Sequence, residues 1–477
     1  MSAVVRYGTP SGRWVIAATV LGSGIAFLDG TVVNVALPAM GTDLGADITG
    51  LQWVVDSYLV TLGALLLLGG SLGDLYGRRR MLVVGLVWFT VFSVSCGVAP
   101  NTAFLVVSRA LQGVGAALLV PGSLAIISAS FAPGDRGSAV GAWSGLAGVV
   151  TAIGPFLGGW LIDAVSWRLI FLLNVPLAAV AVWITVRHVP ESRGSRSSHG
   201  PYVSGAVSAS AGLALLAYGL IERRWWVAVP GGLVLALFVA LERRRPGPMV
   251  PPSLFRSRQF SGANLTTFAV YAALGGALFF VVLQLQINLG YSALEAGAAL
   301  LPVTILMLAV SARAGALAQR IGPRLPMTLG PLVVATGMLL FQRVKPGATY
   351  AASVLPAAVL FGFGLSITVA PLTAAVLAAV EERNLGVASG VNNAVARVAG
   401  LIAVAVLPVL AGISDAASPA ELEHGFGRAM VVCAIVAAAG GVVALATVRE
   451  ATPVQATVQA DLFHSCHDPR RCDESAA

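Results

Sequence analysis

The sequence predicts an all-α protein that crosses a membrane many times, built as two six-helix halves with two inserted helices. Of its 477 residues, 57% are hydrophobic and 10% are charged, whereas soluble domains carry about 25% charged residues. Fourteen apolar runs approach the length that spans a bilayer, since a spanning helix needs roughly 20 residues. Similar loop motifs also recur in the two halves of the chain.

The predicted spans follow one another with short loops. The first six cover residues 14–39, 52–71, 81–99, 103–127, 138–161 and 168–186. The inserted pair covers residues 203–221 and 225–241. The last six cover residues 262–285, 297–317, 326–341, 350–372, 385–411 and 428–448. We therefore expect an N-terminal half over 1–186, cytoplasmic linkers with the inserted pair over 187–259, a C-terminal half over 260–448 and a polar, disordered cytoplasmic tail over 449–477.

A repeated loop supports the division into halves. Residues 73–79 follow the second span, and the similar residues 318–324 follow the tenth. Each is followed, at nearly the same separation, by an acid–arginine pair, at residues 135–136 and 382–383. A repeat of this kind indicates two copies of one structural unit.

The basic residues predict the orientation. Most arginines fall in loops on the same side as both termini, and such loops lie in the cytoplasm in multi-pass membrane proteins. We therefore expect a protein of the cytoplasmic (inner) membrane with both termini in the cytoplasm. The net charge of +8 does not indicate a nucleic-acid partner, because the charges are spread over short loops.

An acid stands in the middle of the first predicted span. Asp29, followed by Asn34, lies within an apolar run, and a carboxylate at the centre of a membrane helix costs about 2.5–3.5 kcal/mol. The usual reason for this cost is a proton or ion path that faces the bundle interior. The alternative is a structural hydrogen bond between helices.

Arg109 lies inside the fourth predicted span, close to Gln112. The first and fourth spans run in opposite directions, so Arg109 reaches the depth of Asp29, and a buried arginine needs an acidic partner. A nearby cation favours the charged carboxylate and burial favours the neutral one, so small rearrangements can switch its proton. We therefore expect Asp29 and Arg109 to form a proton-coupling pair; the alternative is a static ion pair.

Residues 73–79 (Gly-Asp-Leu-Tyr-Gly-Arg-Arg) carry a candidate conformational latch. Gly77 permits a tight turn, and Gly73 lets a neighbouring helix approach closely. Asp74 is expected to pair with an arginine or to receive a helix N-terminus, in a contact that one conformation makes and another breaks. Arg78 and Arg79 complete the latch; the alternative is that they only determine topology.

The fifth span combines small residues with a proline, at Gly154, Pro155, Gly158 and Gly159. Glycines allow helices to pack tightly, and a proline inside a helix gives a kink. On physical grounds alone, helix packing with no further role is the alternative.

Further polar residues are expected to line a cavity. Asp56 lies near the outer end of the second span, where a carboxylate stays more solvated; an interfacial position without a role is the alternative. The thirteenth span brings Asn392, Asn393 and Arg397 into the membrane, as a polar lining or as contacts between helices. The predicted lining comprises Asn34, Asp56, Tyr58, Gln112, Asn392, Asn393 and Arg397.

These motifs resemble those of the major facilitator superfamily, and specifically of its 14-span drug:proton antiporter family. Residues 28–38 (Leu-Asp-Gly-Thr-Val-Val-Asn-Val-Ala-Leu-Pro) resemble that family's first-span signature. Residues 73–79, 109–115 and 154–159 resemble the superfamily's loop 2–3, span 4 and antiporter span 5 motifs, and residues 167–176 resemble a family-typical stretch. The second-half loop departs from the pattern, because Gln319 stands where an acid is expected; the latch is then one-sided.

The resemblance implies a major facilitator fold and alternating access by two rocking halves around a midplane cavity. It implies a proton-driven antiporter that exports amphipathic small molecules, such as drugs, antibiotics or cationic dyes. Its expected partners are the substrate, protons and the bilayer, with no cofactor beyond the proton gradient, and we expect a monomer. An exporter dedicated to an endogenous secondary metabolite or a siderophore is the alternative.

Nothing in the sequence indicates an enzyme. His-Glu-x-x-His and nucleotide-binding motifs are absent, and the predicted cytoplasmic loops are too short for a catalytic domain. A membrane-embedded enzyme or a sensor is therefore a less favoured alternative. His464, Cys466, His467 and Cys472 lack a recognised zinc-finger spacing, so we expect no metal site.

Overall fold

The structure is a computed structural model that describes residues 5–193, 203–245, 248, 250–381, 385–414 and 418–449. Within these ranges the regular secondary structure is helical, apart from a single bridge between Val5 and Phe131. The predicted all-α fold class is confirmed. The tail after Arg449 and the repeated acid–arginine pair at 382–383 lie outside the described residues.

Three groups of helices follow one another along the chain. The N-terminal half contains α1 (Pro10–Leu44), α2 (Ile48–Tyr76), α3 (Arg78–Gly97), α4 (Thr102–Ser130), the short turn η1 (Pro133–Asp135), α5 (Arg136–Ala164), α6 (Leu169–Leu172) and α7 (Asn174–His188). The inserted pair is α8 (Val203–Ile221) and α9 (Trp225–Arg244). The C-terminal half contains η2 (Pro252–Arg256), α10 (Arg258–Leu283), η3 (Gln284–Asn288), α11 (Ala293–Ala299), α12 (Leu301–Ile321), α13 (Arg324–Phe341), η4 (Tyr350–Val354), α14 (Leu355–Ala378), α15 (Leu385–Ala411) and α16 (Pro419–Thr447).

Each predicted span corresponds to one helix or to two consecutive ones. Among the described residues, thirteen helical segments are long and apolar enough to cross a membrane, and a shorter apolar helix, Val207–Ile221, occupies the seventh predicted span. The last span begins at Pro419 and not at residue 428. It starts earlier because Ser418 and Glu421 form a reciprocal capping box that satisfies the first backbone N–H groups.

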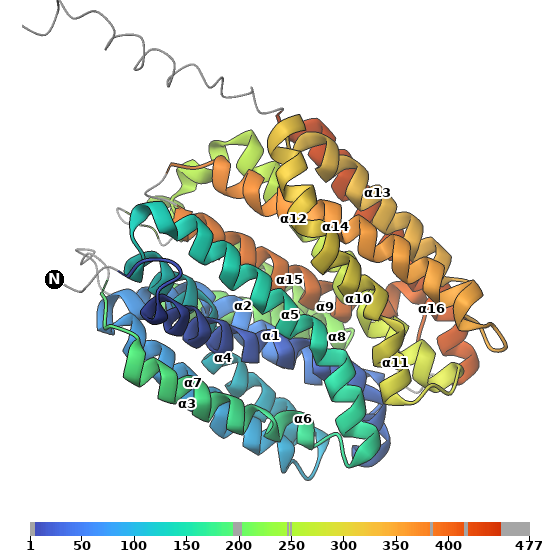
Figure 1. The fold of residues 1–477 in the computed structure, drawn as a ribbon. Coiled ribbons are helices and arrows are strands. Elements are labelled where there is room, and N and C mark those ends of the chain that lie inside the picture. Colours follow the sequence, from blue (N-terminus) through green and yellow to red (C-terminus); the bar gives the residue numbers. More distant parts are fainter. Residues whose placement is uncertain are drawn as a thin grey trace, which may run out of the picture.

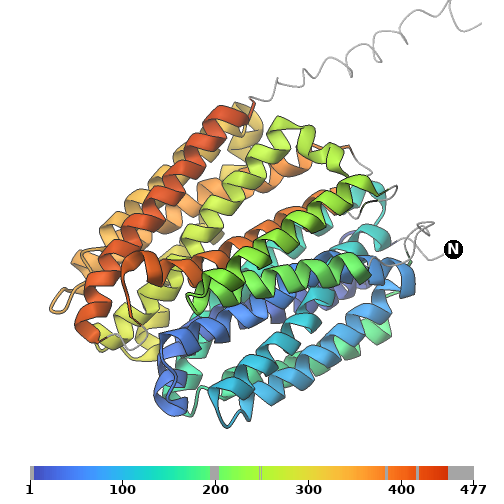
Figure 2. The ribbon, with the colours of Figure 1, turned by 180° about the vertical axis from the view of Figure 1, so that it is seen from behind.

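The two halves lie side by side, with α1 to α7 in one bundle and α10 to α16 in the other (Figure 1). The long helices run between two ends of the molecule. We name the end that holds Val5 and Val448 the terminal end, and the end that holds the turn between α1 and α2 the distal end. Seen from behind, α8 and α9 lie along the seam where α2 meets α15 (Figure 2).

Small residues bring helix backbones close together within each half. A Cβ atom added to Gly115 on α4 would lie 2.7 Å from the backbone nitrogen of Phe89 on α3. In the other half, a Cβ atom added to Gly337 on α13 would lie 2.6 Å from the backbone nitrogen of Phe361 on α14. Lipid is as apolar as the side chains, so close packing of this kind, and not the hydrophobic effect, holds membrane helices together.

Candidate functional site

A buried ion pair lies inside the N-terminal half. Asp29 on α1 and Arg109 on α4 are each 2% exposed, and Nη1 of Arg109 donates to the Asp29 carboxylate. The structure thus brings together the two charged residues that the sequence indicates as partners. An isolated charge inside a bilayer is costly, so each of the two groups stabilises the other there.

Two amide side chains complete the hydrogen bonding of the pair. Gln112 accepts from Arg109 Nη1 at 2.7 Å through Oε1, and donates from Nε2 to Asp29 Oδ1 at 3.0 Å. Asn174, at the start of α7, also reaches Asp29 Oδ1, at 3.5 Å, and donates to Ser93 Oγ on α3 at 2.9 Å. One carboxylate therefore joins α1, α4 and α7, with α3 reached through Ser93.

The Arg109 guanidinium also has partners other than the carboxylate. Its Nε donates to the Val54 carbonyl oxygen on α2 at 3.2 Å. Its central carbon lies 4.3 Å from the ring centre of Tyr58 and 5.8 Å from that of Phe171, and such cation–π contacts stabilise a desolvated cation. Tyr58 is buried and donates its hydroxyl to the Ala26 carbonyl oxygen at 3.1 Å.

Sequence reasoning missed Asn174, Ser93 and Phe171 as members of this network. Asn174 did carry a signal, because burying an amide in an apolar helix is costly unless it has hydrogen-bond partners. Ser93 and Phe171 carried none. A serine in a membrane helix often bonds its own backbone, and a phenylalanine there is ordinary.

Asp56 does not occupy the solvated position that we expected from the sequence. It is fully buried in α2, and within the described part of the chain neither carboxylate oxygen has a hydrogen-bond partner. Gln52, one turn earlier, donates to the Val404 carbonyl oxygen on α15 at 2.6 Å, and Val60, one turn later, packs against α8. Asp56 therefore faces the seam between α2 and α15. The expectation of solvation is wrong because α8 covers this face of α2.

The other predicted cavity residues are distributed over both halves. Asn34 on α1 is half-buried and donates to a carbonyl of its own helix at 3.1 Å. Asn392 donates to two side chains of α10, at 3.2 and 2.7 Å, within the C-terminal half, and Asn393 donates to its own helix at 3.1 Å. Arg397 reaches across the seam, with its guanidinium carbon 5.5 Å from the ring centre of Phe27 on α1.

The loop between α2 and α3 makes its contacts within the N-terminal half. Gly77 follows α2 with a φ of 111°, a conformation that glycine adopts far more readily than other residues. Asp74 pairs with Arg78 at 2.7 Å, and Nη1 of Arg78 donates to the Ala125 carbonyl oxygen on α4 at 3.1 Å. Of the two partners that we considered for Asp74, the structure contains the arginine.

Glu191, which follows α7, caps the start of α3. Its carboxylate accepts from the backbone nitrogen of Arg79 at 3.0 Å and from that of Arg80 at 3.2 Å. A carboxylate at this position satisfies N–H groups that have no partner within the helix and interacts favourably with the helix dipole. A Cβ atom on Gly77 would lie 2.8 Å from this carboxyl group, so Gly77 also provides room for the cap.

Gly73 is not a position of close helix approach, contrary to the expectation from the sequence. The nearest atom to an added Cβ would belong to Arg78, at 3.9 Å, which is an ordinary contact. The close approach occurs one turn earlier, where a Cβ atom on Gly69 would lie 2.1 Å from the Ala117 carbonyl oxygen on α4. At Gly73 the nearest atoms belong to Arg78, which follows the turn after α2, so Gly73 has space around it.

Two glycines of α5 pack against α1 in the same half. A Cβ atom on Gly154 would lie 2.5 Å from Thr31 Oγ1, and one on Gly158 would lie 2.6 Å from Val32 Cγ1. Both positions are within the face that the sequence indicates for tight packing. This face holds α5 against the helix that carries Asp29.

The neighbouring residues of α5 pack against α11 in the other half. A Cβ atom on Gly159 would lie 2.5 Å from the Ala293 carbonyl oxygen. In return, a Cβ atom on Gly297 of α11 would lie 2.3 Å from the Pro155 carbonyl oxygen. Main chain therefore meets main chain across the seam between α5 and α11.

Hydrogen bonds join the halves near the distal end. Asp163, at the end of α5, accepts from the backbone nitrogens of Ala293 and Leu294 at 3.1 and 2.8 Å. Gln286 in η3 donates to the Val35 carbonyl oxygen on α1 at 2.9 Å. Together with the close packing of α5 on α11, these bonds hold the two halves together on this side of the molecule.

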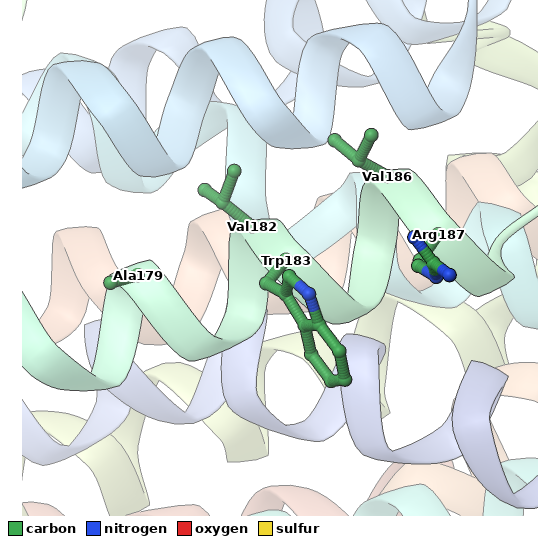
Figure 3. Close-up of a pocket in the computed structure, with 5 residues that line it drawn as sticks. All are labelled: Ala179, Val182, Trp183, Val186 and Arg187. Atoms are coloured by element: carbon green, nitrogen blue, oxygen red, sulfur yellow. The ribbon is translucent and has the colours of Figure 1, made fainter.

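A shallow groove on α7 is separate from this network (Figure 3). Ala179, Val182, Trp183, Val186 and Arg187 line it, all from one helix. Trp183 and Val186 are 56% and 57% exposed, as expected for a helix face that contacts lipid. We therefore do not include the groove in the candidate site.

The chain matches one protein family along most of its length. The model of the Major Facilitator Superfamily matches residues 19–404. The multidrug resistance protein Stp of Mycobacterium tuberculosis is 35% identical over 422 residues, 86% of this chain and 78% of that protein. The puromycin resistance protein pur8 of Streptomyces alboniger is 34% identical over 447 residues, 90% of this chain and 88% of that protein. A structure of the xylose transporter XylE from E. coli in a partially occluded, inward-open conformation has a TM-score of 0.67 at 15% identity, covering 93% of this chain and 99% of that one.

Proposed function

Because this chain belongs to the major facilitator superfamily, we propose that it is a proton-driven antiporter that exports amphipathic small molecules, such as drugs, antibiotics or cationic dyes. The members of this superfamily are transporters and not enzymes, and the chain has their fold. Two relatives are named for resistance to several drugs and to puromycin. Those names support export as the direction and drugs as the class of cargo.

The buried pair of Asp29 and Arg109 carries the proposal. A proton on Asp29 removes the charge that Arg109 faces, while Arg109 keeps its bonds to Val54 and Gln112. The protonation state of Asp29 then changes the attraction between α1 and α4. In the proposed cycle, the charged and neutral forms favour different arrangements of the two halves, which couples proton entry to drug exit.

The proposed cycle is alternating access. The arginines in loops at the terminal end support a cytoplasmic position for that end and for both termini, in the cytoplasmic membrane. The bonds of Asp163, Gln286 and Gln52 join the halves toward the distal end. In this orientation they support a state that is closed to the outside and receives cargo from the cytoplasm.

Cargo is proposed to bind between the halves. Arg397 lies over Phe27 across the seam, and Asp56 faces the seam between α2 and α15 with no protein partner among the described residues. Asn34 and Asn393 extend the predicted polar lining on the two sides. The contact of Asp74 with Arg78 is proposed as the conformational latch at the cytoplasmic end.

Efflux of a panel of dyes from proteoliposomes under an imposed pH gradient tests the proposal. We expect Asp29→Asn to abolish pH-driven efflux of every dye and to leave the chain folded, because asparagine keeps the shape and an acceptor for Arg109. Asp43→Asn is the matched control, since Asp43 is on the same helix and pairs with Arg168 at 2.5 Å in a more exposed position. Full pH-driven efflux by Asp29→Asn would refute the proposed coupling.

A further inference from the structure

The inserted helix α8 lies in the groove between α2 and α15, which belong to different halves. The three helices share one hydrophobic cluster on the distal side of the molecule, and its buried members are Val60, Ala64, Leu213, Ala217, Ile221, Leu401 and Ala405. Figure 2 shows this position, with α8 and α9 running along the seam. The inserted pair therefore contacts both halves at once.

The turn between α8 and α9 is hydrogen-bonded to both halves. Glu222 Oε1 accepts from the indole nitrogen of Trp53 on α2 at 2.9 Å. The next residue, Arg223, donates from Nη2 to the carbonyl oxygen of Ile413, just after α15, at 2.7 Å. Arg223 has a φ of 55°, the left-handed conformation common just after the end of a helix, and the backbone bonds from Arg224 to Gly219 and from Arg223 to Leu220 end α8 there.

The two inserted helices form a stiff unit. A Cβ atom added to Gly219 on α8 would lie 2.2 Å from the backbone nitrogen of Ala228 on α9. One added to Gly231 on α9 would lie 2.5 Å from the backbone nitrogen of Leu216 on α8. Packed this closely, main chain against main chain, the hairpin cannot divide itself between two halves that move apart.

The same seam must open at the distal end if the halves rock. Gln52 on α2, next to Trp53, donates to the Val404 carbonyl oxygen on α15 at 2.6 Å, so the two helices are in direct contact there. When α2 and α15 separate at this end, a rigid hairpin cannot keep its bonds to both halves. The bonds of Glu222 and Arg223 therefore belong to the state in which the distal end is closed.

We propose that the α8–α9 hairpin is a clip that ties α2 to α15 and stabilises the distally closed state through Glu222 and Arg223. Both are positioning residues in this role. The inference rests on the proposed alternating access, and it assigns a task to the two helices that the six-plus-six architecture does not use.

Glu222 holds one half and Arg223 holds the other through the same rigid turn, which makes a specific prediction. The packing of α8 on both halves is common to all variants. Losing the bonds of either residue removes the hydrogen-bonded tie at the turn, so losing those of the other has little further effect. We expect Glu222→Ala and Arg223→Ala each to shift the ratio of distally open to distally closed protein about fivefold. The double variant should also shift it about fivefold, and not by the product of the two single effects.

The measurement uses the full chain in liposomes, with its four cysteines replaced and spin labels at Val98→Cys and Lys345→Cys. Both positions are exposed and lie at the distal end, one in each half. Double electron–electron resonance gives the populations of short and long distances between the labels. This readout does not depend on transport, and dye efflux is measured separately on the same preparations.

Two further variants separate the clip from other effects. Arg224→Ala removes an arginine from the same turn, but Arg224 lies over Trp226 of its own hairpin, so no shift is expected. Asp163→Ala weakens the other seam, between α5 and α11, and its effect should multiply with that of Glu222→Ala. If the alanine variants do not fold, Glu222→Gln and Arg223→Lys give the same test with smaller shifts.

Multiplicative effects of Glu222→Ala and Arg223→Ala, or an equal shift from Arg224→Ala, would overturn the clip. The failure of the proposed function looks different. If the variants shift the distances as expected but the parent chain drives no pH-dependent efflux, the clip stands and proton-driven export is wrong. If the parent chain exports dye and the bonds act independently, export stands and the clip is wrong.

Discussion

Gly158 and Gly159 allow a matched test of the seam between α5 and α11, because the two neighbours face different halves. A Cβ atom on Gly159 would lie 2.5 Å from the Ala293 carbonyl oxygen and 2.6 Å from Leu294 Cα, both backbone atoms. Ordinary contact needs about 3.5 Å, so α5 and α11 must part by about 1 Å in Gly159→Ala. In Gly158→Ala the nearest atom is Val32 Cγ1 at 2.6 Å, in the same half.

Gly158→Ala and Gly159→Ala change helix propensity equally. A difference between their effects on the ratio of distally open to distally closed protein therefore reports the contact between Gly159 and α11. Overpacking costs about 1–3 kcal/mol, and for Gly159→Ala the halves can relieve it by separating at the distal end. We therefore expect the ratio of distally open to distally closed protein to rise about 5- to 150-fold. Gly158→Ala cannot relieve its clash in this way, so it should lower thermal stability and leave that ratio nearly unchanged.

The test measures the distances between spin labels at Val98→Cys and Lys345→Cys in both variants. Thermal unfolding of the same variants is followed in parallel. Equal shifts in the label distances for the two variants would refute the argument, because only the Gly159 contact crosses between the halves. A loss of stability in Gly159→Ala with no change in distances would refute it too.

Three further predictions follow from the site. Asp74→Asn should lower turnover more than substrate affinity, because the Asp74–Arg78 contact lies at the proposed cytoplasmic end of α2, away from the predicted cavity residues; normal cycling with much weaker substrate binding would contradict the latch. Asp56→Asn should weaken export of cations, above all divalent ones, and spare neutral compounds, because a carboxylate with no partner among the described residues can pair with a cation that enters the seam when the halves move apart. Parallel efflux of a monovalent, a divalent and a neutral dye measures this, and uniform losses would assign Asp56 to proton coupling instead. Cysteine labelling near residues 45 and 195 should find the first outside and the second inside; labelling of both from one side would contradict the proposed topology.

The helices and the central pair could be predicted from the sequence because the bilayer imposes simple constraints on it. A span must be long and apolar, and a buried charge must have a partner, and these two constraints indicate Asp29 and Arg109. The burial of Asp56 could not be predicted in this way. It depends on where α8 packs, and an apolar helix carries little information about which groove it fills.

The errors at the loop and the omissions around the pair have a related cause. Gly73 and Gly69 are equally good candidates for close approach in the sequence, and only the crossing point of α2 and α4 distinguishes them. Glu191 is far from α3 in the chain, so its role as a cap depends on how the end of α7 returns to the loop. Asn174 likewise gains its partner only when α7 packs beside α1.

Apart from the bond between Glu222 and Trp53, the hydrogen bonds described across the seams share a property that bears on how such chains diverge. Asp163, Gln286, Gln52 and Arg223 each contribute a side chain, and each bonds to backbone N–H or carbonyl groups across the seam. A carbonyl oxygen is present whatever the side chain, and an N–H group is missing only in proline. The residues whose backbone groups form these bonds can therefore change their side chains without a compensating change in the other half. Recombination between relatives that exchanges whole halves should keep these bonds, so one half can acquire a new cargo preference while the other is inherited intact.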